Sequence, residues 1–444
     1  MKKVYLSVIG FALMCRLNVH AQASQDTLPR NPSVSLYTPV EKDTTHNTGY
    51  SPRALHIDEI NLVSSYYWQN GDHSPVTGGI GTEKVTDISN GIDLKLVWGD
   101  PNYKKNSLTM GFGYDHHTSA SQAYINLSGA SRKGGDRIYP SLDWTTENVK
   151  KGSSFGIGAY YSGEYNYKST GLDLHFSQKT ADKNGEFSAK LQAYFDQVTL
   201  IYPAELIPNT TTTSTGGTTV ITTASGTQTV LSNGQVVENH HKNIPSSARN
   251  TYTASLGYSQ IISPRLQVMF MVDGVAQNGY LGLPFHRVYF ADSSKAVVEK
   301  LPSSRYKLPV GLRANYFLGD NVIIRTYYRY YIDSWGIKSN TAGLEIPLKV
   351  TPFFSISPFY RYYDQSAAKY FAAYGVHTPA DEYYTSNYAY SQFQSHFMGV
   401  GIRLAPPKGV FGWQNLHDLE LRYGHYTQTT DLVSSVVSLS LGFK

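Results

Sequence analysis

The sequence predicts an all-β fold, a transmembrane antiparallel up-and-down β-barrel of about 16 strands. Three observations predict it: apolar residues recur at every second position along most of the chain, short turns alternate with long connections, and the chain ends on a strand. Charged residues make up 16% of the chain and aromatic residues 13%, with 36 tyrosines. This composition favours strands, and its charge content is below that of an ordinary soluble domain.

Alternation of apolar and polar residues is the first of these observations. It is most regular in four segments: 91–98, 186–196, 341–350 and 418–423. Leu191 and Phe187 share one face of the second segment, and Lys190 lies on the other. We expect strands at 57–69, 87–98, 107–117, 137–149, 153–167, 170–179, 185–200, 250–262, 265–277, 306–318, 321–335, 339–350, 353–364, 390–404, 416–428 and 434–444. No long stretch has a helical period, and after the N-terminal segment no run of about 18 apolar residues could form a spanning helix.

The connections differ in length in a regular way. Every second one is short: 99–106, 149–153, 179–186, 262–265, 318–321 and 350–353, with the longer 405–417 in the same place in the order. The others include three long ones: 201–248, which holds the Thr-rich segment 209–229, then 278–305 and 365–389. Short turns at one end and long loops at the other are typical of outer-membrane barrels. We therefore expect the three long loops outside the cell and both termini in the periplasm.

The C-terminal strand supports closure. Residues 437, 439, 441 and 443 are apolar, and the residues between them are Ser or Gly. In a closed barrel the last strand pairs with the first, so no edge is left unpaired. Phe443, one residue before the end, resembles the terminal signal that the bacterial barrel assembly machinery recognises. A soluble β-sandwich or propeller is the alternative, but strands of 10–15 residues are long for it and no blade-length repeat exists.

The N-terminal region reads as an export signal. Residues 1–21 combine basic Lys2 and Lys3 with an apolar stretch and end on Ala21, so we expect a signal peptide there. Residues 22–56 are polar and rich in proline, and we expect an irregular periplasmic tail. Cys15 is the one cysteine, so the mature chain would have no disulfide. Removing three basic residues from the net charge of +5 leaves +2, which gives no argument for nucleic acid.

Several stretches resemble a known family. They are 283–290, 301–320, 325–337, 351–371 and 419–430, with a weaker match at 78–96. Here the chain is similar to an uncharacterised family, classed as a domain of unknown function, of outer-membrane barrels found mainly in Bacteroidota. The resemblance implies barrel architecture and a place in the outer membrane of a Gram-negative cell, in contact with its lipid. It implies no activity and no site residues.

Charged residues on the polar face of the strands are the candidate lumen-lining residues. They are Arg325, Arg329, Asp333, Glu345, Lys349, Glu186, Lys190, Asp93, Lys95, Glu420 and Arg422. We expect them to face inward, because Arg in the middle of the bilayer costs a barrel strand about 2–4 kcal/mol. They form either a charged ring that filters solutes or ion pairs that hold the shape of the barrel. Their mixed signs predict weak ion selectivity.

Aromatic residues crowd one predicted external loop. The candidates for loop binding are Tyr370, Phe371, Tyr374, Tyr383 and Tyr384. Such rings either stack on a sugar or an aromatic ligand, or pack the loop over the mouth as a lid. Both alternatives stay open at the level of sequence.

Histidines give no strong metal or catalytic signal. The pairs at 116–117 and 240–241 are adjacent residues, and neighbours on a strand point to opposite faces. A hydrolase at the rim would need Ser395 with His396, or His425, and a nucleophile needs a base within hydrogen-bond reach. We therefore expect no metal, no cofactor and no enzyme activity. The Gly-rich segment 78–83 lies between strands, so it does not predict a nucleotide site.

These expectations favour one function over two others. The first is a porin-like passage for small solutes of unknown identity. The alternative is a non-conducting binding or structural surface protein with a blocked lumen, and a rim hydrolase ranks last. The tail is too short for a plug domain and about 16 strands fall short of the 22 of plugged transporters. The sequence predicts no oligomeric state.

Overall fold

The computed structural model describes residues 53–118, 135–200 and 246–444, with the backbone of four short strands between residues 211 and 238. The expectations for the signal peptide, for most of the N-terminal tail and for the 240–241 histidine pair lie outside the described residues. Among those residues, no helix is both long enough and apolar enough to cross a membrane.

The barrel consists of consecutive antiparallel strands. They are β1 (His56–Asn70), β2 (Val85–Gly99), β3 (Lys104–His117), β4 (Gly135–Asn148), β5 (Ser153–Gly163), β6 (Tyr167–Lys179), β7 (Gly185–Thr199), β12 (Ser246–Ser263), β13 (Leu266–Gly279), β16 (Ser304–Leu318), β17 (Val322–Asp333), β18 (Lys338–Glu345), β19 (Leu348–Thr351), β20 (Phe354–Gln365), β21 (Phe393–Leu404), β22 (Leu416–Gln428) and β23 (Val433–Phe443). β23 pairs with β1 from Ile60–Phe443 to Asn70–Val433. The sheet is therefore closed, as the C-terminal strand predicts.

β18 and β19 are two parts of one barrel strand. Glu345 pairs with Phe359 on β20, and Leu348 pairs with Ile356, so the register is the same on both sides of the break. The break falls at Pro347, which has no N–H to donate to a neighbouring strand. The 17 strand segments of the sheet thus make 16 crossings, which confirms the expected fold class.

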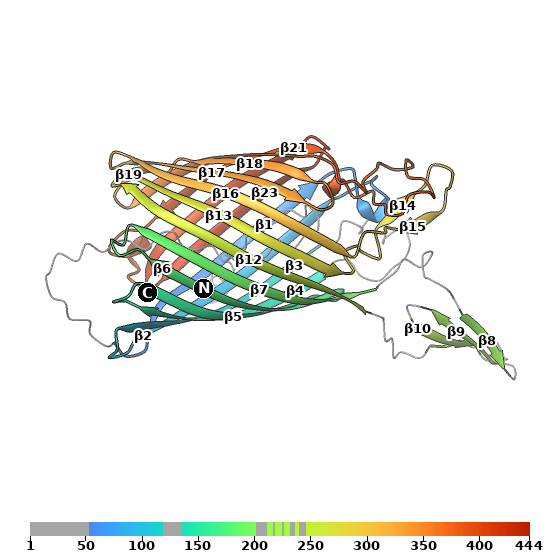
Figure 1. Cartoon of the computed structure of the whole chain (residues 1–444), viewed down its shortest axis with the longest axis horizontal. Helices are drawn as coiled ribbons and strands as arrows, with labels where there is room; N and C mark the ends of the chain where they lie inside the picture. Colours follow the sequence, from blue (N-terminus) through green and yellow to red (C-terminus); the bar gives the residue numbers. More distant parts are fainter. Residues whose placement is uncertain are drawn as a thin grey trace, which may run out of the picture.

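The two ends of the barrel differ, as Figure 1 shows. The short turns, the start of β1 and the end of β23 lie at one end, which we call the short-turn end. One of these turns contains the 3₁₀ helix η4 (Val410–Gly412). At the opposite, long-loop end lie β14 (Arg287–Tyr289), β15 (Ala296–Val298), and the 3₁₀ helices η1 (Pro75–Thr77) and η3 (Tyr388–Tyr390). The backbone segments β8 (Thr211–Thr215), β9 (Thr218–Thr223), β10 (Gly226–Val230) and β11 (Val236–Glu238) form a separate sheet.

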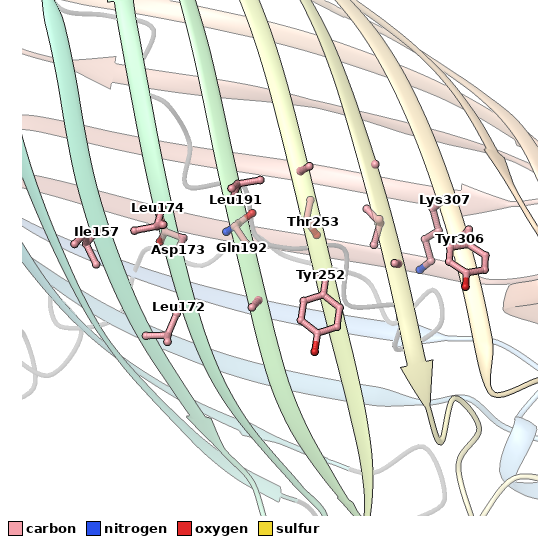
Figure 2. Close-up of a pocket in the computed structure, with 15 residues that line it drawn as sticks. Ile157, Leu172, Asp173, Leu174, Leu191, Gln192, Tyr252, Thr253, Tyr306 and Lys307 are labelled. Carbon is pink, nitrogen blue, oxygen red and sulfur yellow. The ribbon is translucent and has the colours of Figure 1, made fainter.

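Side chains alternate between an apolar outer face and a polar inner face of the wall. Figure 2 shows a patch where Leu172 and Leu191 are 51% and 59% exposed, while the adjacent residues Asp173 and Gln192 are only 2% and 4% exposed. The pocket in this view has a volume of about 820 Å³ and is lined by residues of β5, β6, β7, β12, β13 and β16. Exposed apolar residues continue around the barrel: Phe112, Leu142, Ile157, Leu174, Leu256, Phe270, Leu308, Leu312, Leu344, Met398 and Leu421.

Candidate functional site

A cluster of ion pairs lines the inner face of β17, β18 and β22. Arg422 lies 3.1 Å from Glu345 and 2.9 Å from Glu420, and Arg325 lies 3.7 Å from the other carboxylate oxygen of Glu345. These four residues were each proposed for the lumen from the sequence, on three different strands. The structure brings them together because their strands present them on the face opposite the exposed leucines, next to small residues such as Gly401.

Other proposed lumen residues pair elsewhere on the wall. Lys95 lies 2.8 Å from Asp58, and Lys190 lies 3.3 Å from Asp173. Asp333 accepts hydrogen bonds from the Arg305 guanidinium at the long-loop end. The remaining proposed residues also occupy inner-face positions of their strands. They are Asp93 on β2, Glu186 on β7, Arg329 on β17 and Lys349 on β19. The sequence pattern thus identified individual charges but not their partners.

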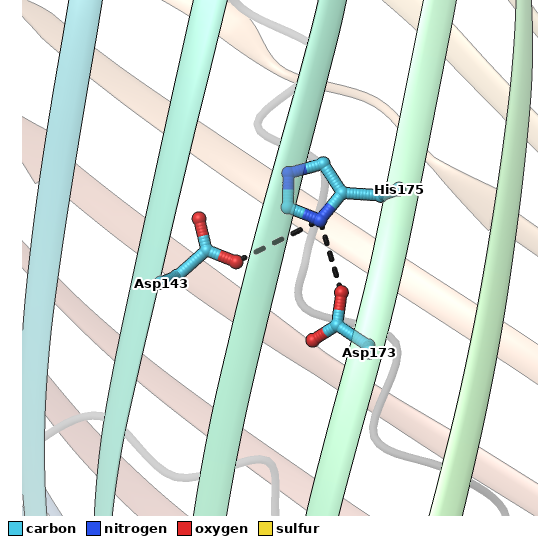
Figure 3. A group of neighbouring side chains, drawn as sticks. All are labelled: Asp143, Asp173 and His175. Carbon is cyan, nitrogen blue, oxygen red and sulfur yellow. Dashed lines mark hydrogen bonds and ion pairs between the residues drawn. The ribbon is translucent and has the colours of Figure 1, made fainter.

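Asp143, Asp173 and His175 form an acidic group on β4 and β6 that the sequence analysis missed (Figure 3). His175 Nδ1 lies 2.9 Å from Asp173 and 3.8 Å from Asp143. The three side chains have ligand atoms within 4.8 Å of one another, a spacing that a metal ion could use. However, Asp173 also accepts a hydrogen bond from Tyr160 and pairs with Lys190. A cation would have to displace that ammonium group, so the arrangement is that of an internally satisfied ion cluster.

Arginines outnumber aspartates on the inner face of β16 to β22, and aspartates outnumber arginines on the inner face of β3 to β7. Inward-facing arginines lie on β16 to β22: Arg313, Arg325, Arg329, Arg361 and Arg422. Inward-facing aspartates lie on β3 to β7: Asp115, Asp143, Asp173 and Asp196. In the closed strand order seven strands separate β4 from β18 in either direction, so the two groups face each other across the barrel.

Exposure of the inner charges falls from the short-turn end to the long-loop end. On β17, the Arg325 side chain is 42% exposed and the Asp333 side chain is fully buried. Likewise, the Lys179 side chain near one end of β6 is 38% exposed, whereas Asp173 in the middle of the strand is fully buried. On these two strands the interior is therefore open to water near the short turns, and the charges farther along are enclosed by side chains.

Three loops at the long-loop end pack on one another, and we call them the cap: residues 71–84, 280–303 and 366–392. Tyr374 contacts Tyr289 with ring centroids 4.8 Å apart, and Tyr384 contacts Phe290 at 5.1 Å. Backbone hydrogen bonds of 2.8 and 3.0 Å join Tyr384 to Lys300. Loops that are far apart in sequence thus share one folded unit.

The remaining aromatic candidates also point into the cap. Tyr370 contacts Trp335 at 5.9 Å and Tyr383 at 5.5 Å, and Phe371 contacts Tyr388 at 5.2 Å. The ring of Tyr388 in turn stacks on His73 from the first loop at 3.7 Å. All five loop aromatics have aromatic neighbours within the protein, and Tyr374 is still 43% exposed.

A buried carboxylate holds two loops of the cap together. Glu299 accepts hydrogen bonds from the Leu283 backbone N–H at 2.7 Å and from the Thr385 hydroxyl at 2.8 Å, and it lies 3.0 Å from His286. Each of these partners belongs to loop 280–303 or loop 366–392. The sequence gives no signal for this residue, because its partners come together only in the folded cap.

The candidates for a rim hydrolase do not come together. Ser395 is buried on the inner face, whereas the neighbouring His396 bonds Tyr360 at 2.7 Å on the outer face. His425 also lies on the outer face, 2.9 Å from Ser435. The pair at 116–117 likewise divides between the faces, as adjacent strand residues do: His116 bonds Asp136 and His117 pairs with Glu164.

A closed antiparallel barrel with an apolar outer belt and a charged interior defines the class of transmembrane β-barrels. Within that class the chain belongs to the family described as "Protein of unknown function (DUF3570)", whose sequence profile matches residues 135–435. This confirms the expected membership of an uncharacterised family. No curated protein matches the chain.

Solved barrels show a distant likeness. OccK1 (OpdK) of Pseudomonas aeruginosa is 7% identical with a TM-score of 0.38, and 87% of this chain and 97% of that chain are covered. A BenF-like porin of Pseudomonas fluorescens Pf-5 is 8% identical with a TM-score of 0.39, covering 87% and 98%. A bacterial polysaccharide outer membrane secretin is 9% identical with a TM-score of 0.41, covering 87% and 98%. Values this low carry no functional argument, and the architecture rests on the strand pairing itself.

Proposed function

We propose that the protein is a channel for small polar solutes in the outer membrane of a Gram-negative bacterium. The observation that carries the proposal is the exposure of charged side chains on the inner face. Arg325, Lys95 and Lys179 are 38–42% exposed although they point away from the outer belt. Charged groups keep such exposure inside a closed wall only where water reaches them.

The opposed charges of the interior support passage of polar rather than apolar solutes. A solute between an arginine-rich wall and an aspartate-rich wall meets a field directed across the pore, which favours molecules with a strong dipole or a charge. Because both signs are present, we expect only weak preference between small anions and small cations, as in a mixed-charge pore.

The alternative is a non-conducting binding or structural protein of the cell surface. One observation favours it: the inner side chains of Asp173, in the middle of β6, and of Asp333, at the long-loop end of β17, are fully buried. Under this alternative the cap and the packed side chains would block the lumen. Three further points are proposed for both functions. Residues 1–21 direct export, the barrel assembly machinery recognises the terminal strand, and the long loops lie outside the cell.

Conductance in planar lipid bilayers distinguishes the two functions. The full-length protein and a variant lacking residues 369–388 should be compared, each after heat-modified gel mobility shows a folded barrel. We expect discrete conductance steps with weak ion selectivity, and larger steps for the deletion variant. Absence of conductance from both folded proteins would contradict the channel and support a blocked lumen. Strong selectivity for ions of one sign would contradict the mixed-charge interior.

A further inference from the structure

A group of polar side chains without protein partners lies on the basic side of the interior. Arg329 on β17 pairs in register with Thr341 on β18, and Thr341 pairs with Tyr363 on β20. The Arg329 Nε atom and the Thr341 hydroxyl oxygen are both buried, and neither has a hydrogen-bond partner in the part of the chain that the structure describes. Thr341 is only 5% exposed. Two buried polar atoms side by side and unpaired indicate a place where a ligand supplies the missing bonds.

Arg361 adds a second guanidinium to this group. It lies on β20 two residues before Tyr363, on the same inner face, and its side chain is exposed to the interior. Neither Arg329 nor Arg361 has a carboxylate within ion-pair distance among the described residues. By contrast, Arg325 and Arg422 have such partners at 3.7 and 3.1 Å. Two neighbouring guanidinium groups with no carboxylate in ion-pair contact favour binding of an anion, and Asp273 on β13 is a more distant counter-charge to Arg329.

An aromatic surface adjoins the two arginines. The Arg361 guanidinium lies 5.1 Å from the centroid of Phe397, and the rings of Phe397 and Phe359 are 5.2 Å apart. The far ends of both rings lie over glycines of the neighbouring strands. A Cβ atom at Gly424 would come within 2.4 Å of Phe397, and one at Gly399 within 2.5 Å of Phe359. Because the Arg422 guanidinium already lies 4.9 Å from the centroid of Phe359, Phe397 is the aromatic side chain that the lumen offers beside Arg361.

We propose that Arg329, Thr341 and Arg361 bind the carboxylate of a small organic anion whose apolar part lies against Phe397. The two carboxylate oxygens accept hydrogen bonds from the guanidinium groups, and the Thr341 hydroxyl donates a further one. Binding needs only an interior that solutes can enter, so this site extends the proposed channel by naming the class of solute.

Calorimetric titration of the folded, detergent-solubilised protein tests the site without relying on conductance. Phenylacetate is the probe, with 2-phenylethanol as the neutral analogue and phenethylammonium as the cationic one. The variants are Arg361→Gln, Arg361→Lys and Thr341→Val. Arg403→Gln is the matched control, because Arg403 is an inner-face arginine already paired with Asp418 at 2.8 Å.

We expect saturable binding of phenylacetate alone. Arg361→Gln should weaken it about tenfold or more, Thr341→Val several-fold, and Arg361→Lys less than Arg361→Gln, while Arg403→Gln leaves it unchanged. Absence of phenylacetate binding, equal binding of 2-phenylethanol, or an equal loss in Arg403→Gln would each overturn the site. A protein that binds phenylacetate but does not conduct would contradict the channel and leave the site standing. A protein that conducts but does not bind phenylacetate would contradict the site and leave the channel standing.

Discussion

Arg422 Nη1 lies 3.1 Å from Glu345 Oε1, although β20 and β21 separate the strands that carry them. The guanidinium can reach across because Gly401 has no side chain, and a Cβ atom there would lie 3.2 Å from Cγ of Arg422. The Arg422 guanidinium also rests 4.9 Å from the centroid of the Phe359 ring. This contact ties four neighbouring strands of the basic wall together on the inside of the barrel.

Loss of Glu345 should have only a small effect on stability. In a Glu345→Gln variant both arginines lose this carboxylate, but Arg422 keeps Glu420 at 2.9 Å and Arg325 alone of the two is left without a carboxylate partner. Because these side chains are 24–42% exposed, we expect a decrease of about 1 kcal/mol or less in the free energy of unfolding. Urea titration followed by gel mobility measures it, and a loss of several kcal/mol would show that the cluster is far drier than described.

The Arg305–Asp333 pair should matter much more. Asp333 is fully buried and also accepts hydrogen bonds from Tyr331 at 2.7 Å and from the backbone N–H of Ile337 at 3.0 Å. Arg305→Leu leaves that carboxylate uncompensated, so we expect destabilisation of about 3–5 kcal/mol. The same substitution at Arg403, whose side chain is 52% exposed, is the control and should cost below about 1 kcal/mol. Equal effects in the two variants would refute the difference in burial.

Gly399 should tolerate no side chain. A Cβ atom there would lie 2.0 Å from the backbone oxygen of Tyr423 and 2.5 Å from the Phe359 ring, so Gly399→Ala has to displace β22. At Gly274 on β13 nothing lies within 4 Å of the same atom. We expect Gly399→Ala to assemble poorly and Gly274→Ala to assemble normally, with folded yield read from heat-modified mobility. Normal assembly of both would argue against the close approach at Gly399.

Glu83 should make the first loop of the cap sensitive to pH. Burial, and secondarily the charge of Asp72, raise the pKa of Glu83 from 4.5 to about 7. Between these values the folded loop holds a proton that the unfolded chain has lost, so the stability of the loop falls as pH rises through this window and is lowest above it. Hydrogen exchange of residues 71–84 should therefore be faster at about pH 8 than at about pH 5, after correction for intrinsic rates.

Glu83→Gln is the decisive variant for that effect. It keeps the shape of the side chain and removes the titration, so the corrected exchange rate should no longer depend on pH in this window. The same pH dependence in Glu83→Gln and in the unaltered protein would assign the effect to another group.

The sequence was sufficient to predict the wall of the barrel, because period-two alternation follows directly from the geometry of a strand. The number of crossings, the alternation of short and long connections and the pairing of the last strand with the first agree with the structure. The expected strand at 339–350 is interrupted at Pro347, and the expected strand at 390–404 begins only at Phe393. Segment ends depend on tertiary contacts, here on Gln365 bonding the backbone oxygens of Ala389 and Ser391.

Partners across the interior could not be predicted from local pattern. Arg361 shares parity with Phe359 and Tyr363, so its inward direction was readable, but its lack of an acidic partner depends on the register of three strands. Asp143 and Asp173 come together through β5, which lies between their strands. Glu299 and Thr385 are 86 residues apart in the sequence, so they meet only when their two loops fold against each other.

The orientation of the wall is tested most directly by nitroxide labels on neighbouring residues of β7. Cysteines would be placed singly at Leu191 and at Lys190 in a Cys15→Ser background, and the folded protein reconstituted in liposomes. Power saturation with oxygen, which partitions into lipid, and with a water-soluble nickel chelate measures the surroundings of each label. We predict that oxygen relaxes the label at 191 more strongly than the nickel chelate does. The label at 190 should not show this preference for oxygen. A label at 191 that responds mainly to the nickel chelate, or a reversal of the two positions, would contradict the transmembrane barrel.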